Sequence, residues 1–429
     1  MKRIAASAFL AVMGSVLLFA SGVENKTNMS TGYLRNPSRN TEAKRPEASY
    51  YNIAGTAFMK NGLHIEAGNQ FVFKEYGNEL NTGNAALDFY SNDETTVWLY
   101  PDADFVYKHD KFAIFGNFGV YAGGGSLEYS EGTSATKLLF AGAAQKALAS
   151  GKTEAAGNFN AAAKNHSLKV TSITYGGQLG GAYKFLDNLS FAAGLRYVHG
   201  TQTMSIKSNY FSVLGNGSNE ISYKANGYTV SGVFGIHWQP IEVVDLAVQY
   251  QSKSSVKYKV TDVDGNLGKS LAGIENGKTF HTDLPAALNL GAGWQALENL
   301  YLSTSFNYYF NTFADQNSIL GETDYANSWE IALGADWKIC KWLSYSAGIQ
   351  YGKQGTKDGS NSTFNPVLDS VCFGTGVEIY PTEELTLAFS GLFAKYFDTD
   401  YYLQDTYKTT LSKKVTNLSF GVTYHFPNL

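Results

Sequence analysis

The chain's candidates for catalysis are a few histidines and serines, and their spacing argues against it. His64, His237 and His425 stand where an alternating pattern turns side chains to one side of extended strands. Ser231 precedes His237 by six residues on one such strand. Six extended residues span about 20 Å at ~3.3 Å per residue, so these side chains cannot touch. The sequence therefore predicts no catalytic residue, no metal ligand and no cofactor, and we do not expect an enzyme.

Basic residues on the same side of the predicted strands could bind an anion instead. Arg196 is the deepest, and Lys253, Lys257 and Lys259 share one parity nearer a strand end. Arg196 or Lys253 could meet the anionic head group of a ligand, because a carboxylate in an apolar interior needs a cation or several donors. Alternatively, Arg196 pairs with a carboxylate of the wall or of the N-terminal segment, and Glu330 and Glu378 are candidates. The sequence leaves both readings open.

The strands that would carry these residues are most evident at the C-terminal end of the chain. In residues 415–426, one side of the pattern is mostly apolar and the other has no large apolar residue. This period-2 pattern recurs in about fourteen segments, among them 172–184 and 244–260, and their connections are alternately short and long. Such a pattern is typical of an all-β fold, a transmembrane antiparallel β-barrel whose apolar side faces lipid.

Aromatic residues give a second indication of a membrane. The last outward position before a short turn is aromatic in five strands, at Tyr107, Tyr183, Trp238, Trp294 and Trp337. Tyrosine and tryptophan favour the membrane–water interface, where one end of the ring is apolar and the other is wet. These positions therefore predict the rim of the barrel at the short turns.

Composition and the two ends of the chain fit an exported protein. The formal net charge of −4 gives no reason to expect a nucleic-acid partner. Lys2 and Arg3 precede an apolar run over 4–19 and small residues at 20–22, so we predict a signal peptide over residues 1–22. Cys340 and Cys372 fall near opposite faces of the membrane, too far apart for a disulfide, and we expect both to be free.

The predicted lumen is lined by small residues that leave room inside. Many inward positions are glycine: Gly119, Gly176, Gly180, Gly194, Gly235, Gly291, Gly293, Gly334, Gly348, Gly374 and Gly376. Glycine can also serve curvature and close strand packing. Residues 23–61 precede the first strand and lack its alternation, so we predict that they form a hatch inside the barrel of residues 62–429.

Short motifs in this hatch carry a resemblance to a known family. Tyr51-Asn52-Ile53-Ala54-Gly55 resembles the Tyr-Asn-Pro-Ala-Gly motif of the FadL family, with Ile53 in place of proline, and Asn36-Pro37-Ser38 is a second near-match. Ser419-x-Gly421-x-x-Tyr424-x-Phe426 resembles the C-terminal signal read by the outer-membrane assembly machinery. With the strand number, the resemblance extends over nearly the whole chain.

The resemblance implies a monomeric, fourteen-stranded barrel in the outer membrane of a Gram-negative bacterium, with Asn36, Pro37, Asn52, Ala54 and Gly55 in the hatch. It implies passive uptake of long-chain fatty acids or other hydrophobic compounds. A ligand would be caught at the external loops, pass to a lumen pocket and leave sideways at a kink in the third strand. Gly116 and Gly119 are the candidates for that kink, because glycine permits bulges.

Other features of the sequence leave alternative functions open. In the long connection 124–171, apolar residues recur at helical spacing and predict a short amphipathic helix over 137–149, either a perch for the ligand or a cap over the mouth. A general porin, or a surface antigen or adhesin that acts through its loops, would show the same strand pattern. A porin would conduct ions steadily, whereas a plugged barrel would not.

Overall fold

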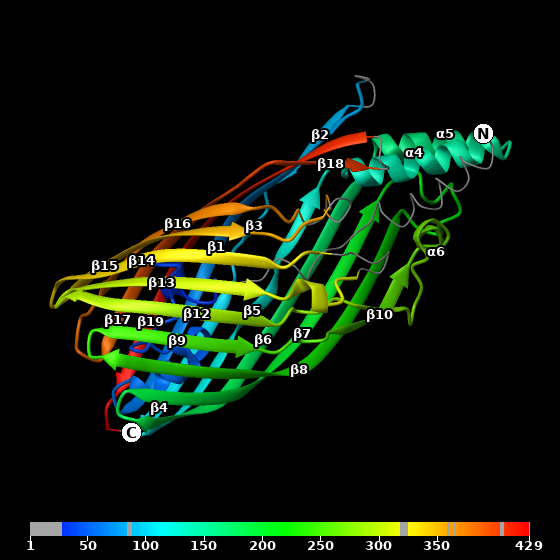
Figure 1. Ribbon diagram of the computed structural model, residues 1–429. Helices are drawn as coiled ribbons and strands as arrows, with labels where there is room; N and C mark the ends of the chain where they lie inside the picture. Colours follow the sequence, from blue (N-terminus) through cyan, green and yellow to red (C-terminus); the bar gives the residue numbers. More distant parts are fainter. Residues whose placement is uncertain are drawn as a thin grey trace.

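Fourteen antiparallel strands close into a barrel around the N-terminal segment (Figure 1). The computed structural model describes residues 28–83, 88–317, 325–357, 361, 363, 366–403 and 407–428. The predicted signal peptide, residues 1–22, therefore lies outside the described residues. Several of the fourteen strands consist of consecutive segments that lie end to end, namely β2–β3–β4, β9–β10, β11–β12 and β17–β18.

The strands are β1 (Gly62–Asn81), β2 (Phe89–Asp93), β3 (Thr96–Val97), β4 (Pro101–His109), β5 (Phe112–Tyr129), β6 (Ser167–Leu186), β7 (Leu189–Lys207), β8 (Glu220–Ile241), β9 (Val244–Gln251), β10 (Lys257–Asp264), β11 (Thr279–His281), β12 (Ala287–Leu297), β13 (Leu300–Tyr309), β14 (Ser328–Cys340), β15 (Leu343–Lys353), β16 (Ser370–Ile379), β17 (Leu385–Tyr396), β18 (Thr399–Leu403) and β19 (Tyr407–Phe426). The helices are α2 (Thr31–Arg35), α3 (Ala48–Tyr51), η1 (Ile53–Phe58), α4 (Ser134–Ala149), α5 (Thr153–Lys164), α6 (Asn266–Ala272) and η2 (Asn311–Phe313). None of the helices among these residues is long and apolar enough to span a bilayer.

The first and last strands close the barrel. β1 pairs with β19 in one unbroken ladder, from Leu63 opposite Phe426 to Asn81 opposite Lys408. A closed sheet has no free edge strand, so the backbone polar groups of the paired strands find their partners within the wall. Figure 1 places the C-terminus at the end of the barrel with the short turns, and α4 and α5 at the opposite end.

The outer surface has the aromatic rim that the sequence predicts. Tyr107, Tyr183, Trp238, Trp294 and Trp337 are all exposed on the outside of the barrel. Along β19 the side chains of Leu418, Phe420 and Tyr424 are also exposed, while the Asn417 and Ser419 side chains between them are buried inside. The alternation therefore separates a lipid face from a lumen face, as predicted.

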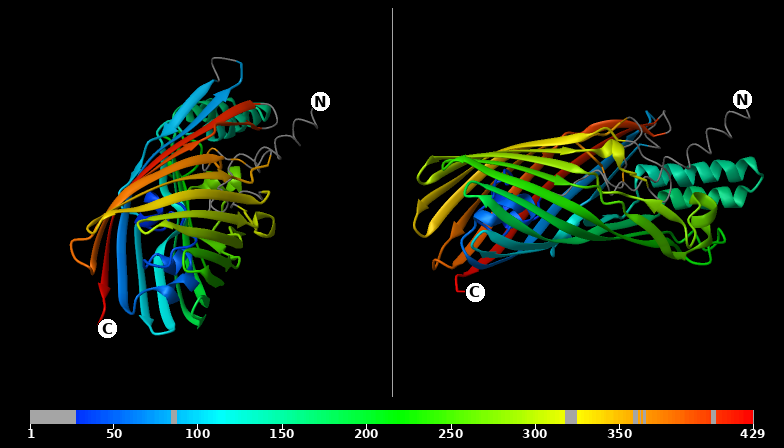
Figure 2. Two further views of the ribbon diagram at one scale, coloured as in Figure 1. Left: turned by 60° about the vertical axis from the view of Figure 1, so that its left-hand side comes forward. Right: turned by 60° about the horizontal axis from the view of Figure 1, so that its bottom comes forward.

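The lumen is filled by residues 28–61 (dark blue in Figure 2), and inward glycines make room for them. A Cβ at Gly334 would lie 1.8 Å from the Oδ1 atom of Asn36, and one at Gly374 would lie 2.6 Å from the carbonyl oxygen of Leu34. Gly235 lies in the same way against Ile53. At these positions glycine is required because the hatch comes so close to the wall. Gly180 and Gly194 instead contact other wall residues, so they serve the packing of the strands.

Two details of the strand pattern differ from the prediction. The predicted strand 244–260 is broken between β9 and β10, and the inward parity shifts by one residue across the break. Tyr258 and Val260 are buried, while Lys257 and Lys259 are exposed on the outer side, so the prediction that these lysines face inward is wrong. A period-2 pattern carries no warning of such a break, because one irregular residue inverts every later position.

The connection 124–171 holds two helices instead of one. α4 contains the predicted helix 137–149 and starts three residues earlier, where Thr133 and Thr136 form a capping box. α5 follows it and was not predicted, since its run of alanines has few large apolar residues. The two helices pack side by side at the loop end of the barrel (Figures 1 and 2). Cys340 and Cys372 are both free, as predicted.

Candidate functional site

The first hatch motif is inserted between glycines of the wall. The Asn36 amide donates to the Asp336 carboxylate (3.2 Å), and its Oδ1 accepts from the backbone N–H of Ser38 (3.0 Å). The ring of Pro37 faces Gly348, where a Cβ would lie 2.8 Å from Pro37 Cδ. The motif therefore fixes a turn of the hatch and docks it on β14 and β15.

The second motif fixes the C-terminal part of the hatch. The Asn52 side chain accepts from the N–H of Gly55 (3.2 Å) and so caps η1, and its amide lies 2.9 Å from the Nδ1 atom of His237. The carbonyl oxygen of Ala54 accepts from the Ser190 hydroxyl (2.7 Å). A Cβ on Gly55 would lie 2.5 Å from the Glu42 carbonyl oxygen, so only glycine fits there. Ile53 replaces the usual proline without loss of the turn, because the cap supplies its geometry.

An ionic network fastens the hatch between these two motifs. Arg35 and Arg45 both bind Glu378 of β16, the first with an N–O distance of 2.8 Å, and Arg39 binds Asp336 of β14 at 3.2 Å. Sequence reasoning expected Glu378 to be a partner of Arg196, but the hatch arginines take it. Long basic side chains in the hatch therefore reach charges on the wall.

Burial and these ion pairs act in opposite directions on the hatch carboxylates. Burial alone would raise the pKa of Glu42, but Arg45 and Arg39 outweigh it and hold that pKa below its ordinary value. At Glu47, burial dominates over the attraction of Arg39, and the pKa lies above its ordinary value. Glu42 is therefore a fixed charge of the network, while Glu47 is the hatch group most ready to hold a proton.

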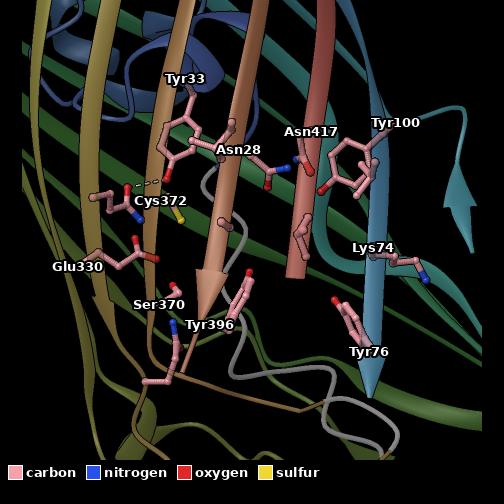
Figure 3. Close-up of a pocket in the computed structure, with 17 residues that line it drawn as sticks. Asn28, Tyr33, Lys74, Tyr76, Tyr100, Glu330, Ser370, Cys372, Tyr396 and Asn417 are labelled. Carbon is pink, nitrogen blue, oxygen red and sulfur yellow. Dashed lines mark hydrogen bonds between the residues drawn. The ribbon is translucent and has the colours of Figure 1, made fainter. Parts of the chain in front are cut away.

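A pocket of about 90 Å³ lies in the lumen on the loop side of the hatch (Figure 3). Tyr33 of the hatch forms one wall and donates to Gln350 across the lumen (2.6 Å). The rest is mixed: the aromatic and aliphatic residues Tyr76, Tyr100, Tyr396, Val72, Leu392 and Val415 lie beside polar residues that include Glu330, Lys74 and Asn417. A volume of this size holds little more than a few water molecules, so a larger ligand needs the tyrosines to move.

Two lysines accompany this pocket, and the sequence reasoning did not single them out. The Lys74 ammonium pairs with Asp93 at 3.2 Å. Lys413, buried in β19, lies over the rings of Tyr76 and Tyr396, 4.7 and 4.4 Å from their centroids. The inward parity of β1 already predicted Lys74, whereas Lys413 preceded the predicted start of its strand.

Arg196 is buried beside a second, smaller lumen pocket, at the contact between β7 and the hatch. Its guanidinium donates to the side-chain oxygens of Gln178 (2.9 Å) and Gln251 (2.9 Å) and lies over the rings of Tyr50 and Tyr121. The ion pairs among the described residues do not include Arg196. The pairing of Arg196 with Glu330, Glu378 or a carboxylate of residues 28–61 is therefore wrong, and within the described part of the chain neutral groups hold this buried positive charge.

Lys253 occupies a different environment. It lies in the break between β9 and β10, half-exposed, and its ammonium pairs with Asp283 at 3.1 Å. Asp283 in turn accepts from the backbone N–H of Val256 (3.0 Å). Of the two predicted head-group residues, the structure places only Arg196 against a lumen pocket.

The hydrogen-bonded pairing of β4 with β5 stops part-way along β5. The ladder ends where Ala103 pairs with Phe118, although β5 continues to Tyr129. Beyond that rung, side chains link the two sides, as in the hydrogen bond from the Tyr100 hydroxyl to the Val120 carbonyl oxygen (3.2 Å). The bulges of β5 lie between Val120 and Ala122 and between Gly123 and Gly125.

These bulges correct the predicted position of the kink. Gly116 and Gly119 lie in regular ladder positions opposite Leu179 and Gly176 of β6, and a Cβ on Gly119 would meet Met29 of the hatch. Gly123 and Gly125 have φ of +78° and +92°, which favour glycine, and they mark the irregular region. The irregular glycines of this strand therefore lie further along it than Gly116 and Gly119.

A depression of about 820 Å³ lies on the lipid face beside this last rung. Its walls are apolar and include Ile65, Ala67, Ala103, Phe105, Phe118, Leu179 and Tyr197. Gln178 and Asn117, whose side chains face the lumen, also contribute to its lining. Gln178 is the partner of Arg196, and Asn117 accepts from the Tyr121 hydroxyl at 2.8 Å. The same two amides thus separate the Arg196 pocket from the lipid-side depression.

Comparison with known proteins identifies this architecture. A family model, described as outer membrane protein transport protein (OMPP1/FadL/TodX), matches residues 138–426, more than half of the chain. The chain belongs to this family. As an OMPP1/FadL/TodX protein it resides in the outer membrane of a Gram-negative bacterium. The sequence resemblance to the FadL family is confirmed.

Solved structures of OMPP1/FadL/TodX proteins share the fold. A FadL homologue of Pseudomonas aeruginosa superposes with a TM-score of 0.70 at 16% identity, covering 95% of this chain and 100% of that one. The toluene transporter TodX of Pseudomonas putida gives 0.62 at 14%, covering 91% and 97%. The toluene transporter TbuX of Ralstonia pickettii gives 0.60 at 13%, covering 91% and 96%. No curated protein matches the sequence.

Proposed function

We propose that the protein is a passive, hatch-gated channel for hydrophobic compounds with an anionic end, of which long-chain fatty acids are the simplest case. The observation that carries this proposal is the buried Arg196, whose neighbours among the described residues are amides and aromatic rings and which Gln178 separates from the lipid-side depression. A neutral hydrocarbon has no anionic group for this charge to bind. The toluene transporters among the similar structures are named for a neutral hydrocarbon, which carries no group for such a charge to bind.

The physics of such a ligand suits the lumen. Burial of each methylene of an alkyl chain contributes about 0.8 kcal/mol, so the tyrosine-lined pocket can hold a tail without specific contacts. The carboxylate, by contrast, is costly to bury unless a cation and donors receive it. In our proposal the tail enters past Tyr76 and Tyr396 and the head group reaches Arg196.

Release would be sideways into the membrane. Gln178 and Asn117 need only change rotamer to join the Arg196 pocket to the depression on the lipid face. The missing ladder above Ala103 and Phe118 means that no backbone hydrogen bonds have to break for the wall to part there. Movement would follow the concentration gradient, with no cofactor and no catalytic step, and the monomer would suffice.

The side exit is tested by filling the depression from the lipid side. Ala103→Trp places a large ring at the last rung, and Ala193→Trp places the same ring on the lipid face of β7 outside the depression. Uptake of a radiolabelled long-chain fatty acid should fall strongly for Ala103→Trp and stay at the wild-type rate for Ala193→Trp. Equal uptake by the two variants, both folded and inserted, would refute exit at this site.

A porin is the main competing function, and conductance separates the two. In planar bilayers the intact protein should show no steady current, because the hatch fills the lumen. Deletion of residues 23–61 should produce a large and steady conductance. A steady current from the intact protein would favour the porin.

A further inference from the structure

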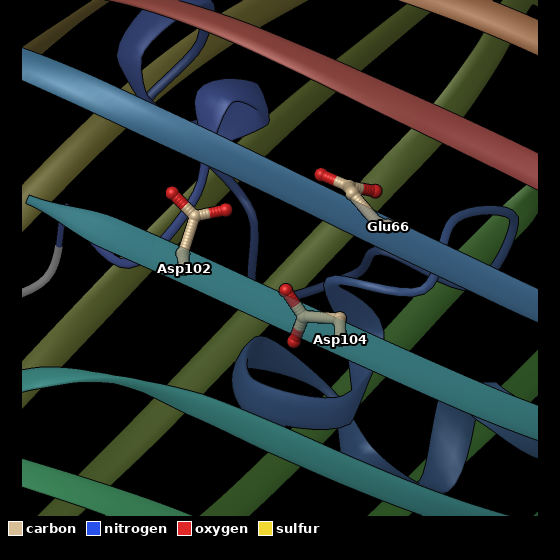
Figure 4. Close-up of side chains that lie close together, drawn as sticks. All are labelled: Glu66, Asp102 and Asp104. Atoms are coloured by element: carbon tan, nitrogen blue, oxygen red, sulfur yellow. The ribbon is translucent and has the colours of Figure 1, made fainter.

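Three carboxylates meet on the lumen wall next to the hatch (Figure 4). Glu66 comes from β1, and Asp102 and Asp104 come from β4. One oxygen from each lies within 4.8 Å of the other two, and all three side chains are buried. The pairing of the strands imposes this, because Glu66 stands opposite Asp104, and Gly68 opposite Asp102. Like charges opposite one another in a sheet destabilise it unless something compensates them.

The protein itself does not supply that compensation. Among the described residues, no lysine, arginine or histidine forms an ion pair with any of the three, since the hatch arginines bind Glu378, Asp336, Glu42 and Glu47. Asp104 accepts from Ser49 (2.5 Å) and Asn117 (2.7 Å) through Oδ1 only, and its Oδ2 has no partner. Unpaired buried carboxylates are costly in their charged form, so the cluster needs either protons or a cation.

Asp102 is the clearest sign of a ligand. By strict hydrogen-bond geometry neither of its oxygens has a partner, although its side chain is almost fully buried. The amide of Gln70 interacts with this carboxylate and also donates to the carbonyl oxygen of Asn28 (2.7 Å). A carboxylate in this state keeps most of its coordinating capacity.

An independent group from the hatch converges on the same place. The Thr31 hydroxyl is buried and has no hydrogen-bond partner. It lies 2.9 Å from the point where a Cβ on Gly68 would stand, and the two oxygens of Asp102 lie 2.7 and 2.9 Å from that point. Glycine at position 68 therefore leaves a space that two unpartnered side chains face, one from the wall and one from the hatch.

We propose that Glu66, Asp102, Asp104 and the Thr31 hydroxyl bind a calcium ion that fastens the hatch to the wall. All four groups are oxygen ligands, which hard divalent cations prefer. Calcium binds oxygen at about 2.3–2.6 Å, so ligands on opposite sides of the ion stand about 5 Å apart, and the three carboxylate oxygens lie within that span of one another. Magnesium demands near-ideal octahedral geometry and usually keeps several waters, so a buried site made of protein oxygens favours calcium. The site joins hatch to barrel on the wall away from the Tyr33 pocket, although Glu66 and Asp104 also line the lipid-side depression. The proposal does not depend on what the channel carries, because calcium binding is measured without a hydrophobic ligand.

The test is direct calcium binding to the purified, detergent-solubilised protein. After treatment with EDTA, isothermal titration with CaCl₂ should show one ion bound per chain, and calcium should raise the melting temperature more than magnesium does. Asp102→Asn and Thr31→Val keep the side-chain shapes and should each weaken binding by about tenfold or more. Glu330→Gln is the matched control, since Glu330 is a buried lumen carboxylate that already accepts from Asn307 and Tyr309, and its affinity should equal the wild-type value.

The outcomes are distinguishable. Thr31→Val changes the hatch and leaves every wall carboxylate in place, so it remains informative if Asp102→Asn fails to fold. No calcium uptake by the wild-type protein, with a melting temperature that depends on pH alone, would mean that protons neutralise the cluster and would overturn the proposal. Uptake that survives both substitutions unchanged would also overturn it. Calcium is titrated without any hydrophobic ligand, so failure of the transport proposal cannot produce either result.

Discussion

Replacement of Arg196 gives the sharpest test of how the channel recognises a ligand. Arg196→Met removes the charge and the donors but keeps most of the buried apolar volume against Tyr50 and Tyr121. A hydrogen bond to a charged group contributes about 1.5–3 kcal/mol. Loss of that contact should therefore weaken binding of a fatty acid by about 10- to 150-fold.

The methyl ester of the same fatty acid supplies the comparison. Its tail gains the same ~0.8 kcal/mol per methylene, but its head group carries no charge for Arg196 to meet. Dissociation constants of acid and ester, measured by displacement of a fluorescent fatty-acid analogue, should therefore differ in the wild-type protein and converge in Arg196→Met. Arg196→Lys keeps a point charge without the planar donors and should fall between the two.

Two results would contradict this reasoning. If Arg196→Met weakened acid and ester equally, Arg196 would act by supporting Gln178 and Gln251 and not by binding the head group. If neither ligand were affected, the head group would bind elsewhere, and Lys253 would be the remaining candidate from the sequence. Melting temperatures of the variants separate both results from a general loss of structure.

Two further predictions concern the hatch and the loops. Gly374→Val should displace the hatch, because a Cβ there would lie 2.6 Å from the Leu34 carbonyl oxygen. Bilayer conductance should rise above that of Gly181→Val, a lipid-facing control whose Cβ would make only an ordinary contact, 3.6 Å from the Phe112 ring. Unchanged conductance would contradict the fit of the hatch. At the mouth of the barrel, burial disfavours the charged form of His166 and lowers its pKa to about 4. When the loop is undocked, the imidazole is free to take up a proton near pH 6.5. The docking of α4 and α5 should thus be fully stable above pH 6.5 and lose up to about 3 kcal/mol of stability as the pH falls to 4. The loss is measurable as faster amide hydrogen exchange in these helices. It should not occur in His166→Gln, and an exchange rate of the wild-type protein that does not change with pH would refute the assignment.

Local pattern was enough for the barrel wall but not for its irregular places. Apolar and polar side chains must alternate along each strand of a lipid-facing barrel. The outward residues Leu418, Phe420 and Tyr424 therefore predict β19 without any information on its neighbouring strands. No local pattern indicates the break before Lys257, and beyond the break the inward and outward positions are exchanged. The bulges at Gly123 and Gly125 were missed for a related reason, since many glycines stood in the same strands and only the pairing with β6 shows which ones leave the ladder.

By itself the sequence determined that the chain forms a fourteen-stranded outer-membrane barrel with a hatch, because alternation, interface aromatics and the Asn-Pro motif are local properties. It also placed Arg196 inside, and the outward position of Tyr107 already implied that Asp102 and Asp104 face the lumen. Only the tertiary structure decided which charges meet. Glu378 binds hatch arginines, Arg196 is left to glutamines, and three carboxylates share one site. Strand register and the path of the hatch set those encounters, and both depend on contacts between residues far apart in the chain.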